Sequence, residues 1–133
     1  MSDSAQPTRP LSPHLQIWRF TVTMAASITH RGTGMVLYGG SLLLSVWLYA
    51  LAFSPALFAV LASFVKSPLG VVIVGGYVWS LCFHLLNGLR HLYWDSGRGL
   101  AVKTAEKTAW AVYAGSLLFA GIILITGYNA MGA

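Results

Sequence analysis

The sequence predicts an all-α integral membrane protein with three membrane-spanning helices, and two observations carry this prediction. Of its 133 residues, 56% are hydrophobic and only 8% are charged, whereas soluble domains carry about a quarter charged residues. The charges also leave three uncharged windows, at positions 32–65, 67–89 and 108–133. Each window exceeds the roughly 20 residues that a helix needs to cross a hydrocarbon core of about 30 Å. An ordinary water-soluble enzyme is therefore excluded, and residues 1–133 are expected to form one membrane domain.

The chain divides into a polar start and three apolar spans. Residues 1–26 are expected to be cytoplasmic or interfacial, because this stretch contains three prolines near its start and lacks the apolar region of a secretory signal. The Ser54-Pro55 pair ends the first span, since proline interrupts a continuing helix, and Lys66 lies in the outer connection. The spans are expected at about 30–53, 69–92 and 108–128. Glycines are frequent in them and are expected to let helices approach closely.

The basic residues predict the orientation in the membrane. Seven of the eight Lys and Arg residues lie before or at the start of the first span, or at the end of the second span and in the loop that follows it, and only Lys66 lies on the other side. This asymmetry predicts a multi-pass protein of a bacterial inner membrane, with a cytoplasmic N-terminus and a periplasmic C-terminus. Because these residues flank apolar spans and form no stripe, no nucleic-acid partner is expected.

His84 is the deepest histidine in the spans. It precedes Arg90 by six residues, which places it about 9 Å further along the helix from that interfacial charge. A neutral imidazole at this depth can bind haem iron or donate a hydrogen bond to a neighbouring helix, and the spacing leaves both interpretations open. His91 lies two turns on, about 10 Å away, so both histidines cannot bind one iron from the same side. Cys82, the single cysteine, is expected to be a small buried hydrophobe.

A second group of polar residues begins the first span. Ser27 and Arg31 are neighbours on one helix face, and Gly34 is expected to continue that face without bulk. A hydroxyl and a guanidinium at the edge of an apolar slot could donate to the carbonyl oxygens of a quinone headgroup. Alternatively, Ser27 caps a helix and Arg31 extends toward lipid phosphates.

Three motifs taken together resemble a known family. Their order, spacing and topology are similar to those of the cytochrome b membrane anchor, the larger of the two anchors, of succinate dehydrogenase (respiratory complex II) in its alphaproteobacterial and mitochondrial branch. The motifs are Arg9-Pro10-Leu11-Ser12-Pro13-His14, Ser27-Ile28-Thr29-His30-Arg31-Gly32-Thr33-Gly34, and His84-Leu85-Leu86-Asn87-Gly88-Leu89-Arg90-His91-Leu92-Tyr93-Trp94-Asp95.

The resemblance implies specific roles for five residues. It implies that His84 is an axial ligand of haem b, and that His30 and Arg31 lie near the haem propionates. It further implies that Ser27, Arg31 and Ile28 line a ubiquinone pocket. Relatives often carry tryptophan where this sequence has Phe20, so the resemblance assigns Phe20 no role.

The resemblance also implies an assembly. The three helices would form half of a haem-binding bundle, with a second small membrane-anchor subunit supplying the other haem ligand. A flavoprotein subunit and an iron–sulfur subunit would dock on the cytoplasmic face, and the complex would oxidise succinate and reduce ubiquinone. Three acidic residues and no flavin or nucleotide motif place the succinate chemistry on partner chains.

Two alternatives remain open, and a third is disfavoured. The chain could be the anchor of a quinol:fumarate reductase, because the residues do not fix the direction of the reaction. It could also be a purely structural anchor that binds no haem. A small transporter or assembly factor would be expected to carry paired charges at mid-membrane, and this sequence has none.

Overall fold

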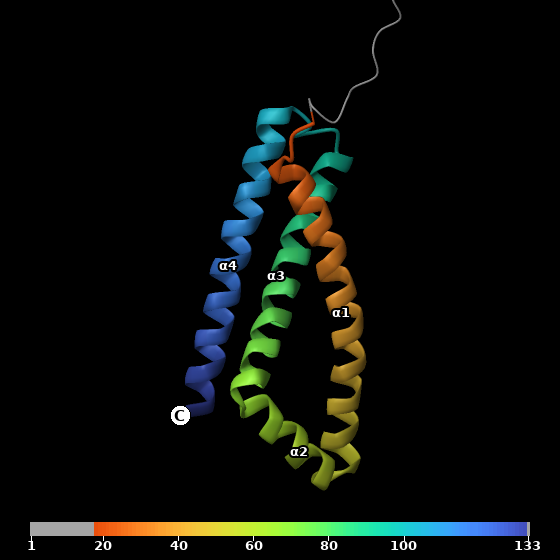
Figure 1. Ribbon diagram of the computed structural model, residues 1–133, viewed down its shortest axis with the longest axis vertical. Coiled ribbons are helices and arrows are strands. Elements are labelled where there is room, and N and C mark those ends of the chain that lie inside the picture. Colours follow the sequence, from red (N-terminus) through yellow and green to blue (C-terminus); the bar gives the residue numbers. More distant parts are fainter. Residues whose placement is uncertain (1–17, 133) are drawn as a thin grey trace, which may run out of the picture.

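A computed structural model describes residues 18–132, which form four helices and no strands (Figure 1). The helices are α1 (Val22–Phe53), α2 (Pro55–Lys66), α3 (Pro68–Asp95) and α4 (Val102–Gly132). Three of them, Val22–Phe53, Pro68–Asp95 and Val102–Ala130, are long and apolar enough to cross a membrane. The predicted class, an all-α membrane protein with three spans, is confirmed.

Helix α1 begins earlier than the expected span. Its first residue is Val22, so the end of the segment 1–26 is already helical, and Arg31 lies within the helix. Thr21 caps this end, since its hydroxyl accepts a hydrogen bond from the backbone N–H of Met24 at 3.4 Å. The expected span was bounded by charged residues, which indicate depth in the membrane, whereas a capping residue determines where a helix begins. Helix α1 therefore starts before the expected span. Residues 1–17, including the Arg9 motif, lie outside the described residues.

The outer connection is itself a helix, which the sequence interpretation did not specify. Ser54 ends α1 and is followed by Pro55, the first residue of α2, and Ser67 and Pro68 repeat this arrangement before α3. Proline suits a first helical position because its fixed φ matches the helix and its missing N–H needs no partner there. The same proline that ends one helix therefore starts the next.

Helix α3 lies between α1 and α4, and the packing is tightest at one end of the molecule (Figure 1). The core there comprises Ala26 of α1, Phe83 of α3, and Ala109 and Val112 of α4. Toward the other end α1 and α3 diverge, and α2 connects them (Figure 1). Cys82 is buried, as expected of a small hydrophobe.

The glycines have two different environments. A Cβ at Gly40 of α1 would collide with the Tyr77 ring of α3, so close helix approach explains this glycine. A Cβ at Gly39, Gly76, Gly88 or Gly121 would meet nothing within 4 Å. For these four glycines, close approach to another helix of this chain is not the explanation.

Candidate functional site

Two predicted site residues from different helices meet at the tightly packed end. The imidazole rings of His30 in α1 and His84 in α3 stack with their centroids 3.9 Å apart and their planes 12° from parallel. Both residues are partly buried. The sequence indicated each residue separately, and the crossing of α1 and α3 brings them together.

The Nδ1 atom of His84 is held by α1. It lies 3.2 Å from the backbone carbonyl oxygen of His30 and 3.2 Å from Oγ1 of Thr33. The ring edge at Cε1 faces Gly34, where a Cβ would lie only 3.1 Å from it. Both of these contacts engage Nδ1, so Nε2 is the nitrogen that keeps its lone pair for another partner.

His91 extends the arrangement toward the end of α3. Its ring lies 5.1 Å from that of His30, and its Nδ1 donates to the backbone carbonyl of Asn87 at 2.7 Å. His84 and His91 thus share the face of α3 that contacts α1, as their seven-residue separation indicates. His30 lies against both.

Ser27 and Arg31 form the predicted pair on α1. Nη2 of Arg31 donates to Oγ of Ser27 at 3.4 Å, and both side chains are exposed. Ile28 is also exposed beside them. Gly34, seven residues after Ser27, packs against the His84 ring.

Arg90, the charge that follows His84 by six residues on α3, is buried. Its guanidinium turns into the contact between α3 and α4, where Nε donates to Oγ1 of Thr108 at 3.0 Å and Nη2 to the carbonyl of Ala105 at 2.8 Å. Nη1 donates to Oδ1 of Asn87, and the Trp94 ring covers the guanidinium at 4.0 Å. These contacts leave Arg90 6% exposed.

Thr33 is the site residue that sequence reasoning missed. It is 4% exposed and donates from Oγ1 to the His30 carbonyl at 2.9 Å while contacting His84. Its position three residues after His30, on the same helix face, was the available signal. The role of Thr33 depends on α3 packing against this face, which spacing within α1 does not specify.

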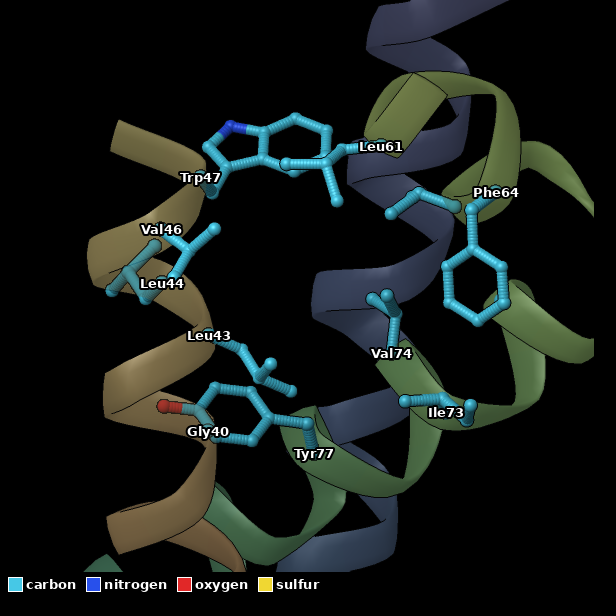
Figure 2. Close-up of a pocket in the computed structure, with 12 residues that line it drawn as sticks. Gly40, Leu43, Leu44, Val46, Trp47, Leu61, Phe64, Ile73, Val74 and Tyr77 are labelled. Carbon is cyan, nitrogen blue, oxygen red and sulfur yellow. The ribbon is translucent and has the colours of Figure 1, made fainter. Parts of the chain in front are cut away.

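A separate apolar cavity lies at the other end of α1. It has a volume of about 260 Å³ and is lined by residues of α1, α2 and α3 (Figure 2). Its walls include Leu43, Trp47, Phe64, Ile73 and Tyr77. The predicted site residues Ser27, His30, Arg31 and His84 are absent from its lining. The cavity is therefore distinct from the histidine cluster, by which we mean His30, His84 and His91.

Comparison with known proteins places the chain in a family. A family model described as succinate dehydrogenase/fumarate reductase transmembrane subunit matches residues 5–123. The succinate dehydrogenase cytochrome b556 subunit of Paracoccus denitrificans is 44% identical over 125 residues, which cover 94% of this chain and 96% of that protein.

Two further relatives extend this similarity. The cytochrome b556 subunit of Rickettsia prowazekii is 35% identical, with 88% of this chain and 91% of that protein covered. The mitochondrial cytochrome b560 subunit of Mus musculus is 40% identical, with 85% and 68% covered. Three apolar helices and bacterial relatives of this kind make the chain a multi-pass inner-membrane protein. It belongs to the family of succinate dehydrogenase cytochrome b subunits.

Proposed function

We propose that this chain is the haem b-binding membrane anchor of a succinate:ubiquinone oxidoreductase, with His84 as an axial ligand of the haem iron. The observation that carries this proposal is the contact between His84 and α1. Two oxygen atoms of α1 engage Nδ1, so Nε2 is left to bind a metal. Histidine ligands commonly donate their second ring N–H in this way to a carbonyl or another acceptor.

The donor set fits a haem better than a bare metal ion. Within residues 18–132, no group of three or more His, Cys, Asp or Glu side chains could hold an ion. An iron that already has four porphyrin nitrogens needs only axial ligands from protein, and one imidazole from this chain is enough. When bound, haem b supplies a one-electron redox centre.

The other residues proposed for the haem belong to α1. His30 supports the ligand through its ring and its carbonyl oxygen. Arg31, exposed one residue on, would pair its guanidinium with a propionate, and His30 would assist at the same edge. The second axial ligand would be supplied by a second small anchor subunit, so the haem would lie between the two subunits.

The proposed quinone site lies on the exposed face of α1. Ser27 and Arg31 would donate hydrogen bonds to a ubiquinone carbonyl, while Ile28 would contact the apolar part of the headgroup. Their support is the Ser27–Arg31 hydrogen bond, which holds both donors together beside an exposed aliphatic side chain.

The chain would function only within a larger complex. Flavoprotein and iron–sulfur subunits would carry out succinate oxidation and deliver electrons from the cytoplasmic side, with this chain anchoring them in the lipid bilayer of the inner membrane. A quinol:fumarate reductase would use the same residues in the opposite direction. The basic residues near α1 and the α3–α4 turn support a cytoplasmic location for this end.

The haem assignment is tested by comparing two histidine variants of the purified complex. His84→Ala should lose the b-type haem, or change its low-spin spectrum, because the ligand nitrogen is absent. His91→Ala should retain iron ligation, since its imidazole lies two turns away. Normal low-spin haem in the His84 variant would rule out this assignment and favour a purely structural anchor.

The quinone assignment is tested with Ser27→Ala and Arg31→Leu, using Arg19→Leu as a control that removes another exposed cation. Ubiquinone reduction should fall, more for Arg31 than for Ser27. A lost hydrogen bond from a charged donor costs about 1.5–3 kcal/mol, and a neutral one about 0.5–1.5 kcal/mol. Electron transfer from succinate to a soluble dye should stay intact and thereby demonstrate assembly. Unchanged ubiquinone kinetics in both assembled variants would contradict the site.

A further inference from the structure

Thr33 is a buried residue whose hydroxyl contacts both α1 and α3. Its side chain is buried between α1 and α3, with the residue 4% exposed. Oγ1 lies 2.9 Å from the carbonyl oxygen of His30 and 3.2 Å from Nδ1 of His84. The same carbonyl oxygen lies 3.2 Å from Nδ1. Three polar atoms therefore form a closed triangle of hydrogen-bonding distances.

The chemistry of these atoms determines where the protons lie. A carbonyl oxygen can only accept, so its contact with Nδ1 of His84 requires a proton on Nδ1. The single hydroxyl proton of Thr33 is directed at the same carbonyl. Oγ1 of Thr33 therefore faces Nδ1 with a lone pair and accepts from it. Both oxygens favour the same tautomer, in which Nε2 is unprotonated.

The remaining contacts of His84 hold the ring without selecting its proton. His30 stacks on the face of the ring, and Gly34 leaves room at Cε1. Rotation of the ring by half a turn about Cβ–Cγ would keep the stacking but replace Nδ1 by a carbon in front of the two oxygens. The hydroxyl of Thr33 adds an acceptor that opposes this rotation.

We propose that Thr33 is a positioning residue that holds His84 as the Nδ1-protonated tautomer, so that Nε2 presents its lone pair to iron. This inference rests on the proposed role of His84 as a haem ligand. Thr33 would act through the hydrogen bonds of its hydroxyl to His30 and His84 and not as a ligand. This role requires the hydroxyl group of Thr33 and does not depend on the volume of its side chain.

The test uses Thr33→Val, which keeps the shape and removes the hydroxyl, and Thr33→Ser, which keeps the hydroxyl. Thr29→Val is the matched control, because Thr29 lies one turn earlier on α1 and its hydroxyl contacts that of Tyr113 at 2.8 Å instead. Haem loss from the purified complex to apomyoglobin and the haem midpoint potential are measured. Loss of such an outer-shell partner typically costs 10–100-fold in metal affinity.

We expect about 10-fold faster haem loss and a shifted midpoint potential in Thr33→Val, with native values in Thr33→Ser and Thr29→Val. Thr33→Ala gives the same comparison with a smaller side chain where the valine variant does not assemble. Native haem binding in both hydroxyl-free variants, or equal defects in the valine and serine variants, would overturn the role of Thr33. If His84→Ala in the same assay loses haem while Thr33→Val is native, only this inference fails. Retention of haem by His84→Ala defeats both.

Discussion

His30 supports the proposed haem ligand with two different parts of one residue. Its ring stacks on the imidazole of His84, and its backbone carbonyl accepts from Nδ1 of that imidazole. The stacking depends on the side chain, whereas the carbonyl is present whatever residue stands at position 30. Substitution of His30 therefore removes one support and leaves the other.

Gly34 gives a prediction at the same scale. Gly34→Ala should displace the His84 imidazole, because the added Cβ would lie 3.1 Å from Cε1 while the ring is already fixed at Nδ1 and on the face that His30 covers. We expect an altered haem spectrum and faster haem loss from the purified complex.

The control for this prediction is Gly32→Ala, two residues earlier on α1. A Cβ at Gly32 would meet nothing within 4 Å, and alanine favours a helix by about 1 kcal/mol over glycine. This variant should keep the native spectrum with equal or higher stability. Matching spectra in the two alanine variants would show that the space at Gly34 does not matter.

The sequence predicts part of the candidate site because part of it is local. The Ser27–Arg31 contact follows from the i, i+4 spacing on one helix, and the shared face of His84 and His91 follows from the helical repeat. The contact between His30 and His84 depends on how α1 is rotated toward α3, which no spacing within either helix determines. The roles of Thr33 and Gly34 were missed for the same reason.

At the scale of the helices, Arg90 joins α3 to the first turns of α4. Its guanidinium donates to the side chain of Thr108 and the carbonyl of Ala105 on α4, and to Asn87 on its own helix. The donor is a charged guanidinium and all three acceptors are neutral, so Arg90 makes charge-assisted hydrogen bonds here and not ion pairs. Such bonds are worth more than neutral ones, and leaving their buried partners without a donor is costly.

Arg90→Met should therefore destabilise the complex by about 1.5–3 kcal/mol, since the Ala105 carbonyl and the Thr108 hydroxyl would lose a charged donor. The measurement is thermal denaturation of the detergent-purified complex. Arg98→Met removes an exposed cation from the following turn and should have little effect. Equal melting temperatures for the two variants would argue against Arg90 as a link between α3 and α4.

The helices themselves were predicted with unequal success. Hydropathy found all three long helices, because a span of about 20 apolar residues is hard to mistake. It did not reveal α2, because Pro55 was taken only as a terminator of the first span. Proline also begins helices, and the apolar residues after it continue as a separate helix between Pro55 and Lys66.

At the scale of the whole molecule, the long helices converge at one end, and α1 diverges from α3 toward the other, where α2 connects them (Figure 1). The start of α1, the end of α3 and the start of α4 meet at the convergent end, close to most of the basic residues. The histidine cluster and the Ser27–Arg31 pair lie toward this end. If the positive charges face the cytoplasm, both proposed sites lie on the side where electrons would arrive.

This orientation predicts the behaviour of fusion proteins. Alkaline phosphatase fused after Ala133 should be active, because the C-terminus would be periplasmic, and a fusion after Gly99 should be inactive. Green fluorescent protein fusions at the same two positions should give the opposite pattern and thereby control for expression. An inactive phosphatase at Ala133 together with a fluorescent fusion there would contradict the predicted orientation.

The backbone carbonyl of His30 gives α1 a particular sensitivity to changes in chain length. One acceptor for the proposed haem ligand is a backbone carbonyl, and its direction depends on how α1 is rotated about its axis. Many side chains could stand at position 30 without removing this acceptor. Insertion or deletion of one residue between His30 and Gly40, which packs against Tyr77 of α3, would rotate this acceptor by about 100° relative to that contact. The side chain at position 30 can therefore change with less effect on this acceptor than the number of residues between His30 and Gly40.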